Sequence, residues 1–317
     1  MKPLTSITLP GRRQREAASK LRAIHNPKAN LSRSSNPLRV VCISDTHNTR
    51  PTPPPGDLLI HAGDLTENGS FDEVQAELNW LSDQPHTYKV LIAGNHDVLL
   101  DETFLTKYPK RRYGQHKTRA DLDWGSVIYL EDSCITLNFP LAESIGDTSQ
   151  NPKPRRLTIF GSPWTPRYGT SAFQYLPDDE FHWSTRFSSL DTKPDIIITH
   201  GPPKHHLDAR DFHRAGCPYL AEEIAQIRPR LVVFGHIHVC YGREDVVLDS
   251  VQRAYEEVMT GWAGWMTVCW MAMLVLWAKL KRLVLPNRVQ EATAFANASV
   301  VSGPKNELTN EPIVVEL

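Results

Sequence analysis

The sequence predicts an α/β fold built on a largely parallel central sheet. Five short runs of apolar, mostly β-branched residues each lead directly into a polar loop. These runs occupy residues 40–43, 58–60, 90–92, 196–198 and 231–234. Between the second and third runs, Phe71, Val74, Leu78 and Leu81 are spaced as one face of a helix. An alternation of strand, polar loop and helix is typical of βαβ units, whose strands are parallel.

The first 37 residues differ in composition from the rest of the chain. They have a single acid, Glu16, and no apolar stretch of the kind that a secretory signal needs. Their basic residues include Arg12, Arg13, Arg15, Lys20, Arg22, Lys28 and Arg33. We expect a disordered basic tail over residues 1–37. A mitochondrial transit peptide, which is also rich in arginine and poor in acids, is the alternative.

Bulk composition excludes several classes of protein. The chain has 317 residues, of which 40% are hydrophobic and 22% charged, so it can build a sizeable core. Its net charge of -1 provides no general attraction to nucleic acid, and no basic stripe interleaved with aromatic residues indicates a nuclease. The five cysteines are scattered and odd in number, which fits a reducing, intracellular and cytoplasmic environment better than a disulfide framework.

All five polar loops carry side chains that bind metals. They read Asp45-Thr46-His47, Gly63-Asp64, Gly94-Asn95-His96-Asp97, Thr199-His200-Gly201 and Gly235-His236-Ile237-His238. Sites in α/β sheets assemble where the carboxyl ends of strands meet, so we expect these loops to lie together. Mixed oxygen and nitrogen ligands suit Mn, Fe, Zn or Ni better than Ca. By contrast, we expect His61, inside the second run, to be a buried hydrogen-bonded histidine.

The order and chemistry of these loops resemble the metallophosphoesterase, or calcineurin-like phosphoesterase, superfamily over residues 38–241. The closest subgroup is the small metallophosphoesterase-domain proteins related to class III cyclic-nucleotide phosphodiesterases. The motifs that carry this resemblance are 63–69 (GDLTENG), 160–166 (FGSPWTP), 200–203 (HGPP) and 234–238 (FGHIH). The resemblance implies a four-layer αββα sandwich of two mixed sheets, with a dinuclear metal site at the strand ends. Residues 38–317 would then form one metallophosphoesterase domain.

The resemblance also implies a ligand set for two divalent metal ions of the Mn, Fe or Zn class. One metal would take Asp45, His47, Asp64 and His238. The other would take Asp64, Asn95, His200 and His236, with Asp64 bridging the two and a hydroxide held between them. His96 would assist the leaving group. Asp97 would orient His96 or, alternatively, cap a helix before residues 98–100.

The segment 251–285 departs from the family pattern. Residues 261–278 hold no charged side chain and four of the eight tryptophans, and Lys279, Lys281 and Arg282 follow. About 18 uncharged residues is the threshold for a membrane span, and flanking Trp, Lys and Arg suit a membrane interface. However, by resemblance the two final strands follow this segment, and a single crossing would separate them from their sheet. We therefore expect a membrane-surface or re-entrant helix over 258–283, a lid over the domain, or an oligomer contact.

These features predict a metal-dependent enzyme that hydrolyses a phosphate mono- or diester, including cyclic-nucleotide-like esters. The substrate would be a small phosphate ester, and no nucleic-acid partner is expected. The alternative is a membrane-associated binding or scaffold protein with a vestigial metal site. The complete ligand set, including both His236 and His238, favours the enzyme.

Overall fold

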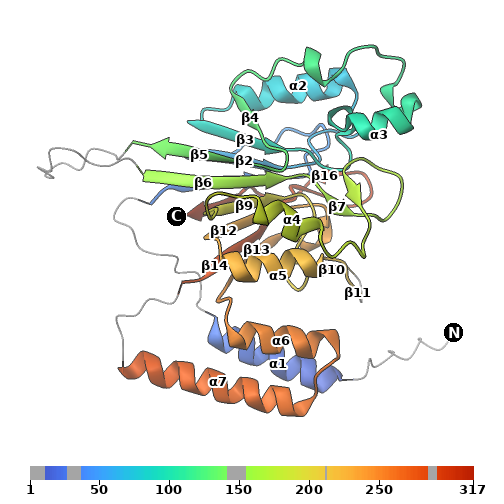
Figure 1. Ribbon diagram of the computed structural model, residues 1–317. Coiled ribbons are helices and arrows are strands. Elements are labelled where there is room, and N and C mark those ends of the chain that lie inside the picture. The colour runs from blue at the N-terminus through green and yellow to red at the C-terminus, as the bar shows by residue number, and fades with distance from the viewer. Residues whose placement is uncertain (1–10, 27–36, 141–154, 211–212, 285–290) are drawn as a thin grey trace, which may run out of the picture. The chain divides into compact units, whose positions relative to one another are not determined.

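The computed structural model describes residues 11–26, 37–140, 155–210, 213–284 and 291–317 (Figure 1). The chain divides into two compact units. The larger comprises residues 31–244 and 294–317, and the smaller comprises residues 1–30 and 245–293. The polar segment 142–154, which its composition predicts to be a surface loop, lies outside the described residues. The predicted boundary between residues 37 and 38 stays a prediction.

The first sheet of the larger unit contains the first three predicted strands. Its five strands are β1 (Arg39–Ile43), β2 (Leu58–Ala62), β3 (Tyr88–Ile92), β4 (Val127–Tyr129) and β17 (Ile313–Glu316). Their order is β17-β1-β2-β3-β4, in which β1 to β4 are parallel and β17 pairs antiparallel with β1. Because β1, β2 and β3 run in the same direction, the loops that follow them meet at one edge.

The second sheet contains the other two predicted strands. Its six strands are β5 (Ser133–Phe139), β6 (Arg155–Ser162), β9 (Ile196–Thr199), β12 (Leu231–Phe234), β13 (Gly242–Val246) and β14 (Thr293–Asn297). Their order is β13-β14-β12-β9-β6-β5, in which β14, β12, β9 and β6 are parallel and β5 is antiparallel to β6. Both sheets are therefore mixed, as the resemblance implies.

The two sheets share one apolar core. Alternate side chains of both sheets, including Ile60, Val90, Ile159, Ile198 and Val233, are fully buried in a single cluster. The opposite side of the first sheet packs against α2 (Phe71–Ser82), whose Leu78 and Leu81 are buried. The helices α4 (His182–Ser188) and α5 (Pro218–Ile227) lie beside the second sheet (Figure 1). This arrangement confirms the predicted αββα sandwich.

Helix α2 shows how local sequence fixes an element. Ser70 accepts a hydrogen bond from the Glu73 backbone N–H, and the Glu73 carboxylate accepts one from the Ser70 backbone N–H. This capping box fixes where the helix begins.

The remaining elements of the larger unit are short: η1 (Val98–Leu100), α3 (Glu102–Lys107), η2 (Pro109–Arg112), η3 (Arg119–Asp121), β7 (Thr165–Pro166), β8 (Gln174–Tyr175), β10 (Ala209–Arg210), β11 (His213–Arg214), η4 (His238–Cys240), β15 (Val301–Ser302) and β16 (Glu307–Leu308).

The smaller unit is a group of three helices, α1 (Arg12–His25), α6 (Ser250–Thr260) and α7 (Trp265–Val284). The described part of the predicted disordered tail thus contains a helix, and residues 1–10 and 27–36 lie outside the described residues. Contacts with residues distant in the sequence stabilise this helix, and no local sequence pattern predicts such contacts. Ala18 is buried against the other two helices, and His25 Nε2 lies 2.8 Å from Asp249 Oδ2.

The predicted apolar segment forms α6 and α7, which Gly261 separates. Its φ of 85° lies in the left-handed region, where glycine carries no steric penalty, and this ends α6. Among the described helices, none combines the length and apolar character that a bilayer crossing requires.

Ile159→Ala tests the shared core. Ile159 is fully buried between the sheets, so its truncation should lower the free energy of unfolding by about 2–5 kcal/mol. Urea denaturation followed by circular dichroism measures the change. Leu176→Ala is the control because that side chain is 57% exposed. Equal effects of the two substitutions would contradict this description of the core.

Candidate metal centre

The two sheets meet at the edge where the metal-binding loops begin. Ser44, which follows β1, forms a parallel bridge with Ser299, which follows β14. Within the sheets, the Asp45 N–H donates to the Gly63 carbonyl at 2.9 Å, and the Gly235 N–H donates to the His200 carbonyl at 3.0 Å. These bonds bring the ends of β1, β2, β9 and β12 together, so that the predicted ligands converge from five loops.

One group of predicted ligands contains Asp45, His47 and His238. Each can offer an atom within 4.8 Å of those of the other two. His238 Nε2 lies 3.2 Å from Asp45 Oδ1. The backbone N–H of His236 donates to both carboxylate oxygens of Asp45 at 3.0 Å, and this holds the carboxylate in place.

A second group contains Asp64, His200 and His236, whose ligand atoms also lie within 4.8 Å of one another. His200 Nε2 is 3.2 Å from Asp64 Oδ2 and 3.1 Å from Asn95 Oδ1. The same Asp64 oxygen lies 3.8 Å from His47 Nε2, which belongs to the first group. Asp64 therefore stands beside both groups, which is the position that a bridging carboxylate requires.

The backbone adopts unusual conformations to present these ligands. Asp45, His47, Asp64 and His236 all have positive φ, between 44° and 68°. This region is sparsely populated by residues with a Cβ, and such conformations concentrate at functional sites. The surrounding structure must therefore stabilise all four.

Glycines allow the close approach of the loops. A Cβ on Gly235 would collide with the Asp45 carboxylate and the Ser44 side chain, and a Cβ on Gly94 would collide with the Asp64 carboxylate and backbone. Gly63 has a φ of 94° and passes close to Ala93 and His200. The glycines that precede ligands in the sequence are thus required by the packing of neighbouring loops.

The electrostatic potential of the site attracts positive charge. Burial alone would raise the pKa of the Asp64 and Asp45 carboxyls. However, neighbouring histidines, His200 for Asp64 and His238 for Asp45, hold both pKa values well below their usual range. In the same way, burial opposes protonation of His200, yet the two carboxylates raise its pKa to about 9. The field that draws protons onto a buried imidazole also favours divalent cations.

The side chain of His47 provides a separate test of metal fit. It is buried, and neither ring nitrogen makes a hydrogen bond. Its Nδ1 lies 3.0 Å from Glu67 Oε2, although the geometry is not that of a hydrogen bond. A buried polar atom without a partner costs free energy, and coordination would satisfy a ring nitrogen. The residues present therefore fit a metal pair. His47, Glu67 and His96 form a third group of possible ligands.

His96 lies next to the metal-binding groups but is held by other contacts. Its Nδ1 is 2.7 Å from the Glu67 carbonyl, and its backbone N–H donates to Asp64 Oδ1 at 2.8 Å. Burial disfavours its charged form, but the Asp64 carboxylate and the Glu67 carbonyl raise its pKa overall. Relative to a free histidine, these neighbours therefore favour the protonated form of the imidazole.

Asp97 has a different set of partners from those that the sequence predicts. Its carboxylate accepts hydrogen bonds from the backbone N–H groups of Leu65, Thr66 and Gly94 and from the Thr66 hydroxyl. It makes no side-chain cap of the following turn η1. The bonds given for Asp97 join the loops after β2 and β3, and the Glu67 carbonyl, rather than Asp97, fixes the imidazole of His96.

Two other histidines, His61 and His206, have structural partners. His61 is fully buried, its Nε2 lies 3.0 Å from Thr46 Oγ1, and burial lowers its pKa to about 3. This confirms the expectation of a buried, hydrogen-bonded histidine. His206 stacks on the Phe295 ring at 3.8 Å, and its Nδ1 lies 2.9 Å from Glu244 Oε1. His206 thus packs within the larger unit.

Tyr168 is a site residue that the sequence does not indicate. Its ring centre lies 5.0 Å from that of His236, and its hydroxyl lies near the side chains of Asn95 and Ser171. The side chain is nevertheless 59% exposed, so it can contact a bound ligand. Tyr168 follows the short strand β7, far from the five metal-binding loops in sequence, and no motif marks it.

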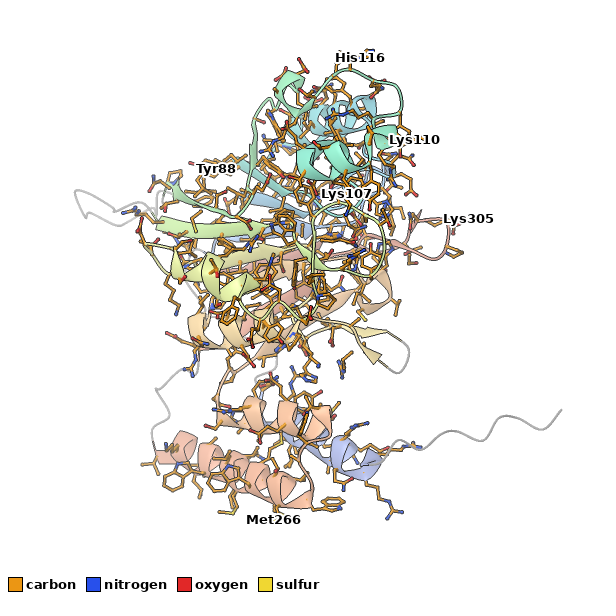
Figure 2. All side chains as sticks on the ribbon, turned by 45° about the vertical axis from the view of Figure 1, so that its right-hand side comes forward. Tyr88, Lys107, Lys110, His116, Met266 and Lys305 are labelled. Atoms are coloured by element: carbon orange, nitrogen blue, oxygen red, sulfur yellow. The ribbon has the colours of Figure 1, made fainter. Side chains whose placement is uncertain are left out.

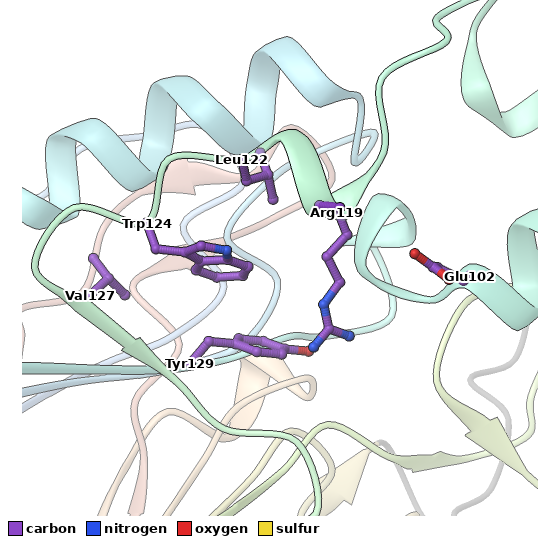
Figure 3. Close-up of a pocket in the computed structure, with 7 residues that line it drawn as sticks. Glu102, Arg119, Leu122, Trp124, Val127 and Tyr129 are labelled. Atoms are coloured by element: carbon purple, nitrogen blue, oxygen red, sulfur yellow. The ribbon is translucent and has the colours of Figure 1, made fainter.

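A separate pocket lies on the larger unit, with a volume of about 480 Å³ (Figure 3). It is lined by Glu102, Arg119, Ala120, Leu122, Trp124, Val127 and Tyr129. None of the predicted metal ligands belongs to it. Two of its polar side chains bind Glu131, which is not part of the lining: Arg119 Nη1 lies 2.6 Å from Glu131 Oε2, and the Tyr129 hydroxyl donates to the same oxygen.

Comparisons with known proteins agree with this geometry. A family model described as calcineurin-like phosphoesterase matches residues 38–240. Human metallophosphoesterase domain-containing protein 1 is 36% identical over 219 residues, which are 64% of this chain and 61% of that protein. A UPF0046 protein of Caenorhabditis elegans is 31% identical over 218 residues, which are 65% of each chain.

The similarity to a third relative extends over more of the chain. A protein of Emericella nidulans named probable rhamnogalacturonate lyase C is 39% identical over 289 residues. This alignment covers 90% of the chain but only 25% of that protein. The chain thus spans a quarter of this relative and about three fifths of the human one.

Gly235→Ala tests the packing of the metal-binding loops. The added methyl group would collide with the Asp45 carboxylate, so the variant should fold but bind less metal than the parent protein. Equilibrium dialysis against Mn²⁺ or Zn²⁺, followed by elemental analysis, measures the metal bound. Gly264→Ala is the control because a Cβ there meets nothing within 4 Å. Full metal content in Gly235→Ala would contradict the described geometry.

Proposed function

Because the chain belongs to the calcineurin-like phosphoesterase family, we propose that it hydrolyses a phosphate mono- or diester with the aid of two divalent metal ions. The observation that carries this proposal is the position of Asp64 between two groups of ligands, Asp45, His47 and His238 on one side and Asn95, His200 and His236 on the other. Metals of the Mn, Fe or Zn class suit these oxygen and nitrogen donors. The substrate would be a small phosphate ester, and cyclic-nucleotide-like esters belong to this class.

The residues of the chain would divide the work between binding and proton transfer. When bound, two metal ions neutralise phosphoryl oxygens and make a water molecule more acidic. Asn95 contributes a neutral oxygen, so the ligand set adds less negative charge than a third carboxylate would, and an anionic substrate is tolerated. Tyr168 is exposed above Asn95 and His236 and would contact the ester.

His96 would act on the leaving group. The Glu67 carbonyl accepts from Nδ1, so the imidazole is fixed in orientation and Nε2 is left to face a ligand. The Asp64 carboxylate and the Glu67 carbonyl keep the pKa of His96 raised. A protonated imidazole beside the centre can donate to the departing oxygen. We infer the role of Asp97 to be indirect, through the loop that carries Asn95 and His96.

The alternative function is a membrane-associated binding or scaffold protein with a vestigial metal site. A vestigial site would be expected to have lost ligands or the residues that support them. Here the seven predicted ligands lie together, and the glycines that permit their approach are present. This favours the enzyme. An intracellular, cytoplasmic location is part of the proposal and rests on the scattered cysteines.

Asp64→Asn tests the dinuclear mechanism. Replacing the carboxylate removes a charged ligand from both groups, so bound metal should fall and hydrolysis of bis(p-nitrophenyl) phosphate should be nearly abolished. Metal content and initial rates, with Mn²⁺ added, measure the two effects. Asp179→Asn is the control because its side chain is 44% exposed. Unchanged turnover in Asp64→Asn would rule out the mechanism.

His96→Ala separates proton transfer from metal binding. The variant should keep its metal and lose roughly 10²–10⁴-fold in rate, which is the usual scale of general acid–base assistance. The loss should be smaller for nitrophenolate leaving groups, which need little protonation, than for alkyl leaving groups. His116→Ala, at an exposed residue, is the control. Loss of metal from His96→Ala would show that His96 is a ligand instead.

A further inference from the structure

Helix α7 leaves most of its apolar side chains uncovered. Its buried residues Val268, Met271 and Val275 form the core of the smaller unit with α1 and α6. By contrast, Met266 is 89% exposed and projects outward from the helix, as Figure 2 shows. Leu283 is 79% exposed. An exposed apolar surface of this kind marks a contact with a protein or a membrane.

The exposed residues form one continuous side of the helix. At about 100° per residue, Trp265, Met266, Trp270, Met273, Trp277 and Leu280 fall on one side of α7, which we call the α7 apolar face. Each of these six side chains is between 47% and 89% exposed. The side that packs on α1 and α6 is opposite. The α7 apolar face is therefore distinct from the surface that holds the smaller unit together.

Positive charges lie along both edges of this face. By the same helical spacing, Lys279 and Lys281 fall just beyond its two edges. Both lysines are exposed, and Lys281 Nζ lies 5.2 Å from the Trp277 ring centre. Residues 258–290 contain no Asp or Glu. The face thus combines apolar and aromatic side chains with cations and has no carboxylate of its own.

We propose that the α7 apolar face binds the surface of a membrane that contains anionic lipid. Tryptophan favours the depth of the headgroups, and lysines at the edges of an apolar face can extend to anionic phosphates. Charge distinguishes this partner from a second copy of the chain. In a parallel pair of such helices, the lysines of both copies would lie near one another with no carboxylate of the face between them. Anionic lipid instead neutralises these lysines.

Vesicle binding by the full-length protein tests the proposal. The protein should float with phosphatidylcholine vesicles that contain phosphatidylserine, and less with vesicles of phosphatidylcholine alone. The triple variant Trp265→Gln, Trp270→Gln and Trp277→Gln should lose at least about tenfold in affinity. Lys279→Gln with Lys281→Gln should lose roughly fivefold per lysine, on anionic vesicles only.

The control is Leu176→Gln with Phe181→Gln. These side chains are 57% and 66% exposed and belong to the larger unit, so vesicle binding should be unchanged. Analytical ultracentrifugation without lipid measures whether the protein forms a dimer. It therefore distinguishes a membrane from a second copy of the chain as the partner. Absence of vesicle binding, or equal binding by the tryptophan triple variant, would overturn the proposal. A dimer that the triple variant abolishes, with no binding to vesicles, would identify a second copy as the partner instead.

Discussion

Two buried carboxylates, Asp45 and Asp64, place the strongest constraint on this structure. They lie at the junction of the two sheets, where desolvation opposes their charge. The chain compensates them with backbone N–H groups of His236 and His96, with the Ser299 hydroxyl, and with histidine side chains. Each compensating group comes from a different strand-end loop than the carboxylate it serves. The contacts that form the candidate metal centre therefore also join the ends of the two sheets.

Because the candidate site and the sheet junction share contacts, several residues of the larger unit support the site although they are not among the predicted metal ligands. The Asp97 carboxylate joins the loop after β3 to the loop after β2 through three hydrogen bonds and accepts a fourth from Gly94 in its own loop. Gly94 and Gly235 provide the space in which the two acidic side chains lie. Residues held at positive φ are stable only where surrounding contacts fix them. These contacts hold the site residues in place without any ligand, and such preorganisation is what electrostatic stabilisation of a bound charge requires.

The smaller unit follows a different principle. Its three helices bury a modest core around Tyr255 and Met271 and leave the α7 apolar face in contact with solvent. The segment that forms α6 and α7 lies between β13 and β14 in the chain, and yet these two strands are neighbours in one sheet. An insertion between neighbouring strands disturbs the sheet little, because the cost of closing a loop grows slowly with its length. The chain can therefore carry a surface for an additional partner without changing the phosphoesterase core.

The sequence by itself determined the sheet-forming runs, the parallel strand–helix pattern and the candidate metal ligands. These features are local, since a β-branched run followed by Gly, Asp or His indicates a strand that ends in a polar loop. Only the tertiary structure decided the rest. It placed Tyr168 beside Asn95, assigned Asp97 to the loops after β2 and β3, and made a helix of residues 12–25. Each of these outcomes depends on groups distant in the sequence. Tyr168 is brought to Asn95 by the packing of the two sheets, and His25 is held by Asp249 from more than two hundred residues away. Local propensity carries no information about such partners, because the stabilisation arises only when the folded chain brings them together.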